Sequence, residues 1–214
     1  MRSTSVFFKQ VVAGFTVLMA LTVLLGIGYP AAVWAVSRIG SDSAEGSPIR
    51  DASGCVVGSA LIGVDTTVED GRPDPYFHTR VTGSVADDDA FAAGDPSAAL
   101  PLNQGPSSDT LASFIEQRRA AIAERENVDP AAVPVDAVTG SGSGVDPDIS
   151  PAYAELQVSR VAAATGKSRD EVRALVASNT DGRQFGFLGQ PTVNVATLNV
   201  DLGLTAPDCS TTGG

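Results

Sequence analysis

The chain has 214 residues, a formal net charge of −11 and a pI near 4.4. An acidic surface of this kind repels nucleic acid and anionic lipid, so the charge argues against a DNA or RNA partner. The composition, 43% hydrophobic with 22 glycines and 13 prolines, is typical of a globular protein rich in loops and argues against a disordered chain.

The first predicted element is a hydrophobic segment, Val11–Ser37, that carries no formal charge. A membrane-spanning helix needs about 20 apolar residues. Tyr29 and Trp34 lie toward one end, where such side chains favour the membrane interface. We therefore expect a short N-terminus over residues 1–10 and a transmembrane helix over 11–37, with Pro30 ending or kinking that helix. The alternative is a cleaved signal peptide, whose apolar core is shorter, at about 7–15 residues.

Basic residues flank the hydrophobic segment on both sides, so charge alone does not orient it. Arg2 and Lys9 precede the segment, and Arg38 and Arg50 follow it. The signal-like N-terminus favours a cytoplasmic N-terminus and a domain outside the cytoplasm.

The rest of the chain predicts an α/β (α+β) domain attached to the single N-terminal helix. A Gly/Ser-rich linker over residues 38–48 precedes one domain over 49–204, and a flexible tail over 205–214 follows it. Apolar runs and helix-capping residues predict strands at 55–57, 61–64, 185–188 and 193–195, and helices at 107–126, 150–165 and 168–176.

The two cysteines, Cys55 and Cys209, are far apart in the sequence. A metal or redox site usually places its cysteines close together, as in C-x-x-C. If both lie in an oxidising compartment, they could instead form one disulfide bond.

Two polar clusters suggest ligand sites, and each has a simpler interpretation. The Gly140–Gly144 loop resembles a phosphate loop, but the sequence lacks the G-x-x-x-x-G-K-[ST] pattern, and a turn fits as well. Asp136, Asp146 and Asp148 could bind a hard cation, but the calcium-loop pattern is absent, so we expect no metal.

The only histidine, His78, would have to serve any Ser-His-Asp triad. No G-x-S-x-G motif supplies a nucleophile, so a hydrogen-bonding role for His78 is expected. Arg80 and Arg160 are expected to pair with carboxylates. These observations favour a subunit or adaptor over an enzyme.

Several stretches resemble the C subunit of the potassium-transporting ATPase of the Kdp system. The most specific is Val133–Pro151, VPVDAVTGSGSGVDPDISP, followed by Gln157–Val161 and by Phe185–Val195, FGFLGQPTVNV. Gly58–Gly63 also fits, and the hydrophobic helix lies where the family has one. Departures such as Val64 and Gln190, where the family usually has other residues, affect upstream and loop contacts.

The resemblance marks a set of candidate site residues, none of them catalytic. They are Asp136, Thr139, Ser141, Ser143, Gly144, Asp146, Pro147, Ser150, Gln157, Arg160, Asn194 and Asn199.

The resemblance also implies a function in high-affinity, ATP-driven potassium uptake at the bacterial cell membrane. The partners would be a channel-like, potassium-translocating subunit and a P-type ATPase subunit that hydrolyses ATP. The family's C subunit is described as a catalytic chaperone that raises the affinity of the ATPase subunit for ATP, and Gln157 matches a glutamine linked to that role. ATP would then be the only cofactor, bound in a ternary complex.

A domain outside the cytoplasm cannot reach cytoplasmic ATP, so the implied topology disfavours a direct nucleotide contact. We expect instead that the domain docks on the outer face of the channel subunit. The alternatives are a membrane-anchored hydrolase that uses His78, or a stand-alone binding module.

Overall fold

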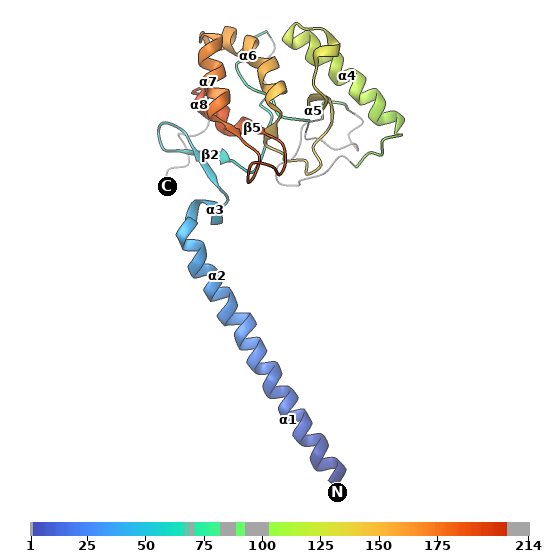
Figure 1. Ribbon diagram of the computed structural model, residues 1–214, viewed down its shortest axis with the longest axis vertical. Coiled ribbons are helices and arrows are strands. Elements are labelled where there is room, and N and C mark those ends of the chain that lie inside the picture. Colours follow the sequence, from blue (N-terminus) through green and yellow to red (C-terminus); the bar gives the residue numbers. More distant parts are fainter. Residues whose placement is uncertain (1, 67, 69–70, 82–88, 93–102, 205–214) are drawn as a thin grey trace. The chain divides into compact units, whose positions relative to one another are not determined.

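The structure is a computed structural model of the chain that describes all residues except 1, 67, 69–70, 82–88, 93–102 and 205–214. The chain divides into two compact units, Met1–Gly46 and Ser47–Gly214 (Figure 1).

The first unit is one long run of helix. Its elements are α1 (Arg2–Val23), the π-helical η1 (Leu24–Gly28), α2 (Tyr29–Ser37), the short 3-10 helix η2 (Arg38–Gly40) and α3 (Ser41–Ala44). Among the described residues, the Thr4–Ala44 stretch is the one helix long and apolar enough to cross a membrane. The predicted hydrophobic helix is therefore present as a candidate membrane span.

The boundaries of this helix differ from those predicted. The helix begins at Arg2, so residues 2–10 are helical, and most of the predicted linker over 38–48 is helical as well. Pro30 does not end the helix but lies in the first turn of α2. A proline ring clashes with the carbonyl four residues earlier, and the wider turn of η1 just before it relieves such crowding.

The second unit combines helices with two small antiparallel sheets. Its strands are β1 (Pro48–Arg50), β2 (Val56–Ser59), β3 (Asp148–Ile149), β4 (Thr180–Asp181) and β5 (Thr192–Asn194). Its helices are α4 (Asp109–Glu126), the 3-10 helix η4 (Pro130–Ala132), α5 (Val135–Val138), α6 (Pro151–Thr165), α7 (Arg169–Ser178) and α8 (Val195–Asp201). β1 pairs with β2, and β5 lies between β3 and β4. This is the predicted α+β domain.

Side-chain caps explain where the longer helices begin. Ser108, Ser150 and Ser168 accept hydrogen bonds from the first free amides of α4, α6 and α7. Ser168 and Glu171 form a reciprocal capping box, and Gly166 ends α6 in the left-handed conformation. The predicted helix starts are confirmed.

The hydrophobic core forms where the helices α4 to α8 meet β3 and β5. The predicted stripe of α6, Val158, Val161 and Ala162, is buried there. Val193 at the centre of the three-stranded sheet is fully buried, and Phe77 enters from a segment without regular structure. The core thus packs helices against a short sheet and encloses one residue of the 74–81 segment.

Two predicted strands are wrong. Leu61–Val64 crosses the backbone of Asp146 instead of pairing in a sheet, and Gly63 donates its amide to the Val145 carbonyl at 2.8 Å. A Cβ at Gly63 would lie 2.3 Å from the backbone carbonyl oxygen of Asp146, so only glycine allows the two backbone segments to come this close. Phe185–Leu188 forms a turn, with the bridge Gln184↔Leu188 at its base.

The C-terminal prediction is right for a strand at 193–194 but misses the helix that follows. Asn194 caps α8 by accepting a hydrogen bond from the Thr197 amide, so Val195 begins a helix. Most of the 82–102 region and the tail over 205–214 lie outside the described residues.

Candidate functional site

The most distinctive site in the second unit is a pair of side-chain amides that hold Phe77 and His78. Asn199 on α8 accepts from the Phe77 amide at 2.8 Å and donates to the Phe77 carbonyl at 2.9 Å. Gln157 on α6 accepts from the His78 amide at 2.8 Å and donates to the His78 carbonyl at 3.2 Å. We call Asn199 and Gln157 the amide clamp. Each side-chain amide makes a pair of hydrogen bonds to the N–H and C=O of one residue, as a neighbouring β-strand would.

Arg160 extends the amide clamp toward residues 74–76. Its guanidinium donates to the carbonyls of Asp74 and Tyr76 at 2.8 and 2.9 Å, and to both carboxylate oxygens of Glu126 at 3.0 and 3.1 Å. The Glu126 side chain is fully buried and also accepts from Arg125 at 2.8 Å. The two arginines therefore neutralise a carboxylate that would be costly to bury alone.

His78 lies between two aspartates. Its Nδ1 is 2.9 Å from Asp65 and its Nε2 is 2.6 Å from Asp74, and the residue is 8% exposed. Burial alone would lower the pKa of His78, but the hydrogen bonds to the two carboxylates outweigh it and raise the pKa. Burial acts to raise the pKa of Asp74, and the contact with His78 reverses this effect and lowers it.

The environment of His78 confirms the predicted hydrogen-bonding role. A general base needs a ring nitrogen that can reach the substrate, and both nitrogens of His78 already contact carboxylates. This geometry does not support the hydrolase interpretation.

The Gly140–Gly144 loop is ordered by its own serine. Ser141 is fully buried, and its hydroxyl accepts from the amides of Gly144 at 2.9 Å and of Ser143 and Asp146 at 3.3 Å. Gly144 has a φ of +75°, which glycine adopts without strain. These amides would hold the anion in a phosphate loop, so their use by Ser141 favours the interpretation as a turn.

Arg80 fixes the same loop from the outside. It donates to Asp146 at 3.2 Å, to the Gly140 carbonyl at 2.9 Å and to Thr139 at 3.3 Å. Both arginines singled out in the sequence, Arg80 and Arg160, thus pair with carboxylates as predicted.

The remaining candidates connect neighbouring elements. Asp136 accepts from the amide and hydroxyl of Ser150 at 2.8 and 2.9 Å, which ties α5 to the start of α6. Asn194 donates to the Ala60 carbonyl at 2.8 Å, and the Pro147 carbonyl accepts from the Val195 amide at 2.9 Å. Among the described residues, no group of three acidic, histidine or cysteine side chains is placed to hold a metal ion.

Sequence reasoning missed the charged half of this site. Arg118 and Glu126 are buried on α4 although both are charged. Phe114, Arg118, Ile122 and Glu126 follow one another at intervals of four residues, which places them on one face of the helix. The available signal was therefore a charged residue within an apolar stripe. Asp65 and Asp74 carry no such local signal.

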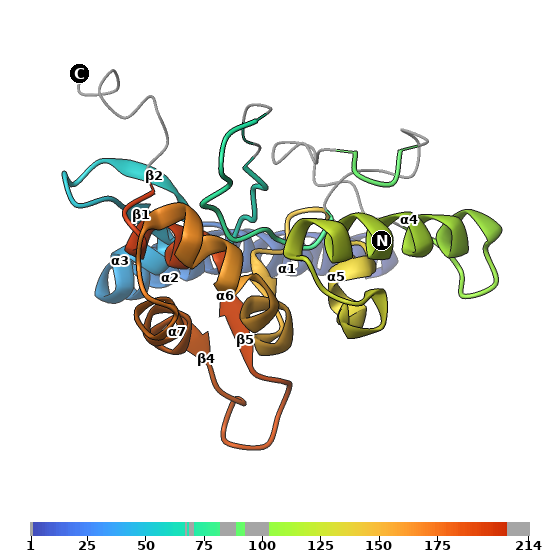
Figure 2. The ribbon, with the colours of Figure 1, turned by 90° about the horizontal axis from the view of Figure 1, so that it is seen from above.

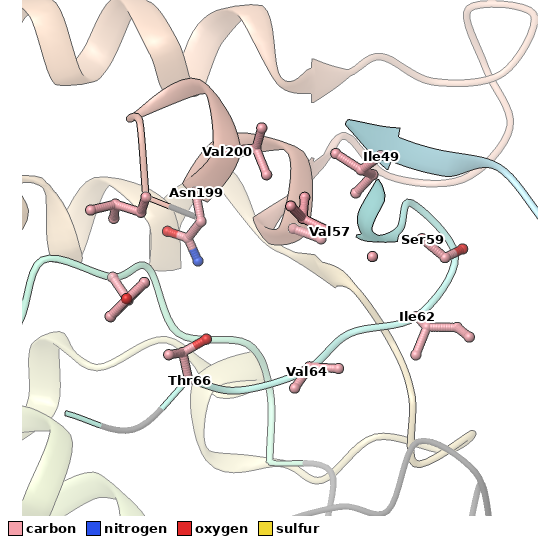
Figure 3. Close-up of a pocket in the computed structure, with 12 residues that line it drawn as sticks. Ile49, Val57, Ser59, Ile62, Val64, Thr66, Asn199 and Val200 are labelled. Carbon is pink, nitrogen blue, oxygen red and sulfur yellow. The ribbon is translucent and has the colours of Figure 1, made fainter. Parts of the chain in front are cut away.

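A cavity of about 230 Å³ adjoins the amide clamp between β1, β2, α8 and the 62–66 segment (Figure 3). Its walls are mainly apolar, with Val57, Val64 and Val200 facing the same space. Asn199 also lines it, but its amide already binds Phe77.

The predicted site residues thus form connected structural groups around the 58–81 segment. The amide clamp and Arg160 hold residues 74–78, the Gly140–Gly144 loop receives Arg80, and Asn194 holds Ala60. The candidate residues marked by the resemblance therefore serve to hold the backbone of this segment in place.

Comparison with known proteins identifies relatives over nearly the whole chain. A family model described as "K+-transporting ATPase, c chain" matches residues 11–203. The potassium-transporting ATPase KdpC subunit of Kineococcus radiotolerans is 43% identical over 93% of this chain and 95% of its own length. The protein of the same name from Caulobacter vibrioides is 46% identical over 83% of this chain and 84% of its own length. The one from Koribacter versatilis is 37% identical over 93% of this chain and 96% of its own length.

Proposed function

Because the chain belongs to the family of K+-transporting ATPase c chains, we propose that it is a membrane-anchored subunit that supports the assembly of a potassium-transporting ATPase complex. As a member of this family it is an accessory subunit and not itself an enzyme, and ATP hydrolysis belongs to another subunit. The partners we propose are a channel-like, potassium-translocating subunit and a P-type ATPase subunit.

The observation that carries this proposal is the use made of the candidate residues. The amide clamp and Arg160 use their hydrogen-bonding groups to bind the backbone of residues 74–78. The 74–78 segment is half-buried to buried, so holding it in one conformation gives the domain a fixed shape. A fixed shape suits a protein that binds other proteins, because pre-ordered segments lose little entropy on binding.

The membrane orientation belongs to the same proposal. We place the N-terminus in the cytoplasm, the Thr4–Ala44 helix in a bacterial cell membrane, and the second unit outside the cytoplasm, on the outer face of the channel subunit. The hydropathy of the helix supports the membrane span, and the signal-like N-terminus supports the direction.

An effect on ATP affinity would then be indirect. The Gln157 amide is fully buried and holds the His78 backbone, so a nucleotide could reach it only after those hydrogen bonds break. We propose that any rise in the ATP affinity of the ATPase subunit follows from stabilising the complex.

Deletion of the second unit tests this function. The chain is co-expressed with its channel-like and ATPase subunits, either complete or cut after Gly46 so that only the anchor remains. We expect the shortened chain to lower the yield of intact complex and the potassium uptake of cells at low external potassium. Unchanged assembly and uptake would refute the proposal.

A further inference from the structure

The loop between β4 and β5 exposes large apolar side chains that the fold does not use. Phe185 is 80% exposed, Phe187 69% and Leu188 47%. Figure 2 shows this loop projecting from the body beyond the ends of the two strands. Two exposed phenyl rings on one turn go beyond the single exposed apolar residues that ordinary surfaces carry.

The turn, Gln184–Leu188, is held by its own backbone and is referred to below as the aromatic turn. Gln184 and Leu188 exchange two hydrogen bonds of 2.9 Å, and the Gly186 amide donates to the Arg183 carbonyl at 3.0 Å. The exposed rings are therefore presented by an ordered segment.

The backbone at the first ring is strained. Phe185 has a φ of +55°, a conformation that bulky residues rarely adopt and that asparagine or glycine tolerates. A phenylalanine that is both strained and exposed contributes little to the stability of the isolated domain. The feature is better explained by a contact that the isolated chain lacks.

We propose that the aromatic turn is a docking element whose two phenyl rings enter an apolar pocket on the outer face of the channel-like subunit of the ATPase complex. This inference rests on the proposed function, since it requires that the chain assembles with other subunits. Rigid aromatic side chains are the residue type that most often dominates protein interfaces, and pre-ordering the turn reduces the entropy lost on binding.

The charge around the turn favours a protein pocket over a lipid surface. Residues 182–191 carry one formal charge, on Arg183, whose guanidinium donates to Gln190 at 2.9 Å. The chain as a whole carries −11, so anionic lipid would repel it. A fluid bilayer also places no demand on the direction of each ring, whereas a pocket does.

Replacement of both rings tests the proposal in the full complex. The double variant Phe185→Asn/Phe187→Ser is co-expressed with the partner subunits, and the complex is purified through a tag on this chain. We expect the recovery of partner subunits to fall roughly tenfold or more, the loss typical of removing interface hot spots. The thermal midpoint of the isolated chain should not fall, because asparagine suits the positive φ.

The matched control is Val135→Ser, which removes an equally exposed apolar side chain, 71% exposed, from α5. This variant should recover partner subunits as well as the unaltered chain does. Full recovery with the double variant would overturn the docking role of the turn. If the unaltered chain itself recovers no partner subunits, the proposed function fails, and the docking inference fails with it.

A fluorescent reporter separates a protein pocket from lipid. Phe187→Trp is placed in a Trp34→Phe background, so that the only tryptophan lies in the aromatic turn. We expect solvent-like emission when the chain is reconstituted alone in vesicles of neutral and anionic lipid. With the partner subunits present, we expect a blue shift in the difference spectrum between the complex with Phe187→Trp and the same complex with the Trp34→Phe chain alone. A blue shift in vesicles without partners would identify lipid as the occupant and overturn the proposal.

Discussion

At the scale of single residues, Glu126 depends on Arg160 for its burial. The Glu126 carboxylate has no exposed surface and pairs with Arg160 at 3.0 Å. Arg160→Met leaves this carboxylate with Arg125 alone and removes the donors to the Asp74 and Tyr76 carbonyls. We expect the free energy of unfolding to fall by about 3–5 kcal/mol, measured by chemical denaturation.

The control for that substitution is Arg173→Gln. Arg173 also contacts a carboxylate, Glu155 at 2.7 Å, but both side chains are about half exposed. Its loss should cost less than about 1 kcal/mol. Adding Glu126→Leu to Arg160→Met should recover part of the stability, because the fully buried carboxylate is gone, while Arg125 is partly exposed and keeps its hydrogen bond to the Tyr153 hydroxyl. Equal losses at Arg160 and Arg173 would contradict this account.

The pKa of His78 makes stability depend on pH. The raised pKa of His78 means that the folded state binds its proton more tightly than the unfolded state. This contribution is complete below the unfolded value of about 6.5 and is lost as pH rises through the folded value. The lowered pKa of Asp74 acts in the opposite sense and is lost as pH falls below about 4.

We therefore expect the thermal midpoint of the detergent-solubilised chain to fall as pH rises from about 6 to about 9. His78→Gln should be less stable at the acidic end and should remove most of this decline. Arg173→Gln should keep it. A decline of the same size in His78→Gln would show that other groups cause it.

At the scale of elements, the sequence predicts helices better than it predicts the segments between them. The capping serines Ser108, Ser150 and Ser168 mark helix starts because their hydrogen bonds are local. The amide clamp joins residues 79 and 122 positions apart, so no local period can reveal it. The resemblance indicated Gln157 and Asn199, but only the structure shows what they hold.

The strand errors have the same origin. The run Leu61–Val64 is apolar, as a strand would be, but the amides of its first two residues donate to Ser59, and the Gly63 amide donates to the distant Val145 carbonyl. Phe185–Leu188 is also apolar, and the positive φ values of Phe185 and Gly186 fold it into a turn. The sequence shows correctly that both segments are apolar. Their hydrogen-bond partners, however, depend on the tertiary structure.

The crossing of Gly63 over Asp146 gives a prediction about an element without regular structure. Gly63→Ala would place a Cβ 2.3 Å from the backbone carbonyl oxygen of Asp146, so one of the two backbone segments must move. We expect a loss of about 1–3 kcal/mol in the free energy of unfolding, the range found for overpacking. Gly58→Ala, where a Cβ meets nothing within 4 Å, is the control and should cost less. No difference between the two variants would contradict the close approach.

At the scale of the whole molecule, the predicted disulfide bond and the proposed orientation depend on each other. Cys209 lies outside the described residues, so the bridge to Cys55 stays a prediction. Disulfides persist in oxidising compartments and are rare in the cytoplasm. A bridge between these cysteines would therefore support a second unit that lies outside the cytoplasm.

Alkylation of the chain in native membranes tests both together. We expect no thiol to react when the membranes are denatured in the presence of an alkylating agent, and two to react after reduction, as read from the intact mass. Cys55→Ser is the control, because the remaining Cys209 should then react without reduction. Two reactive thiols in the unreduced wild-type chain would remove the bridge and, with it, this support for the orientation. A bridged chain would also gain stability, since closing a loop this long removes on the order of 5 kcal/mol of unfolded-state entropy, and reduction should lower the thermal midpoint accordingly.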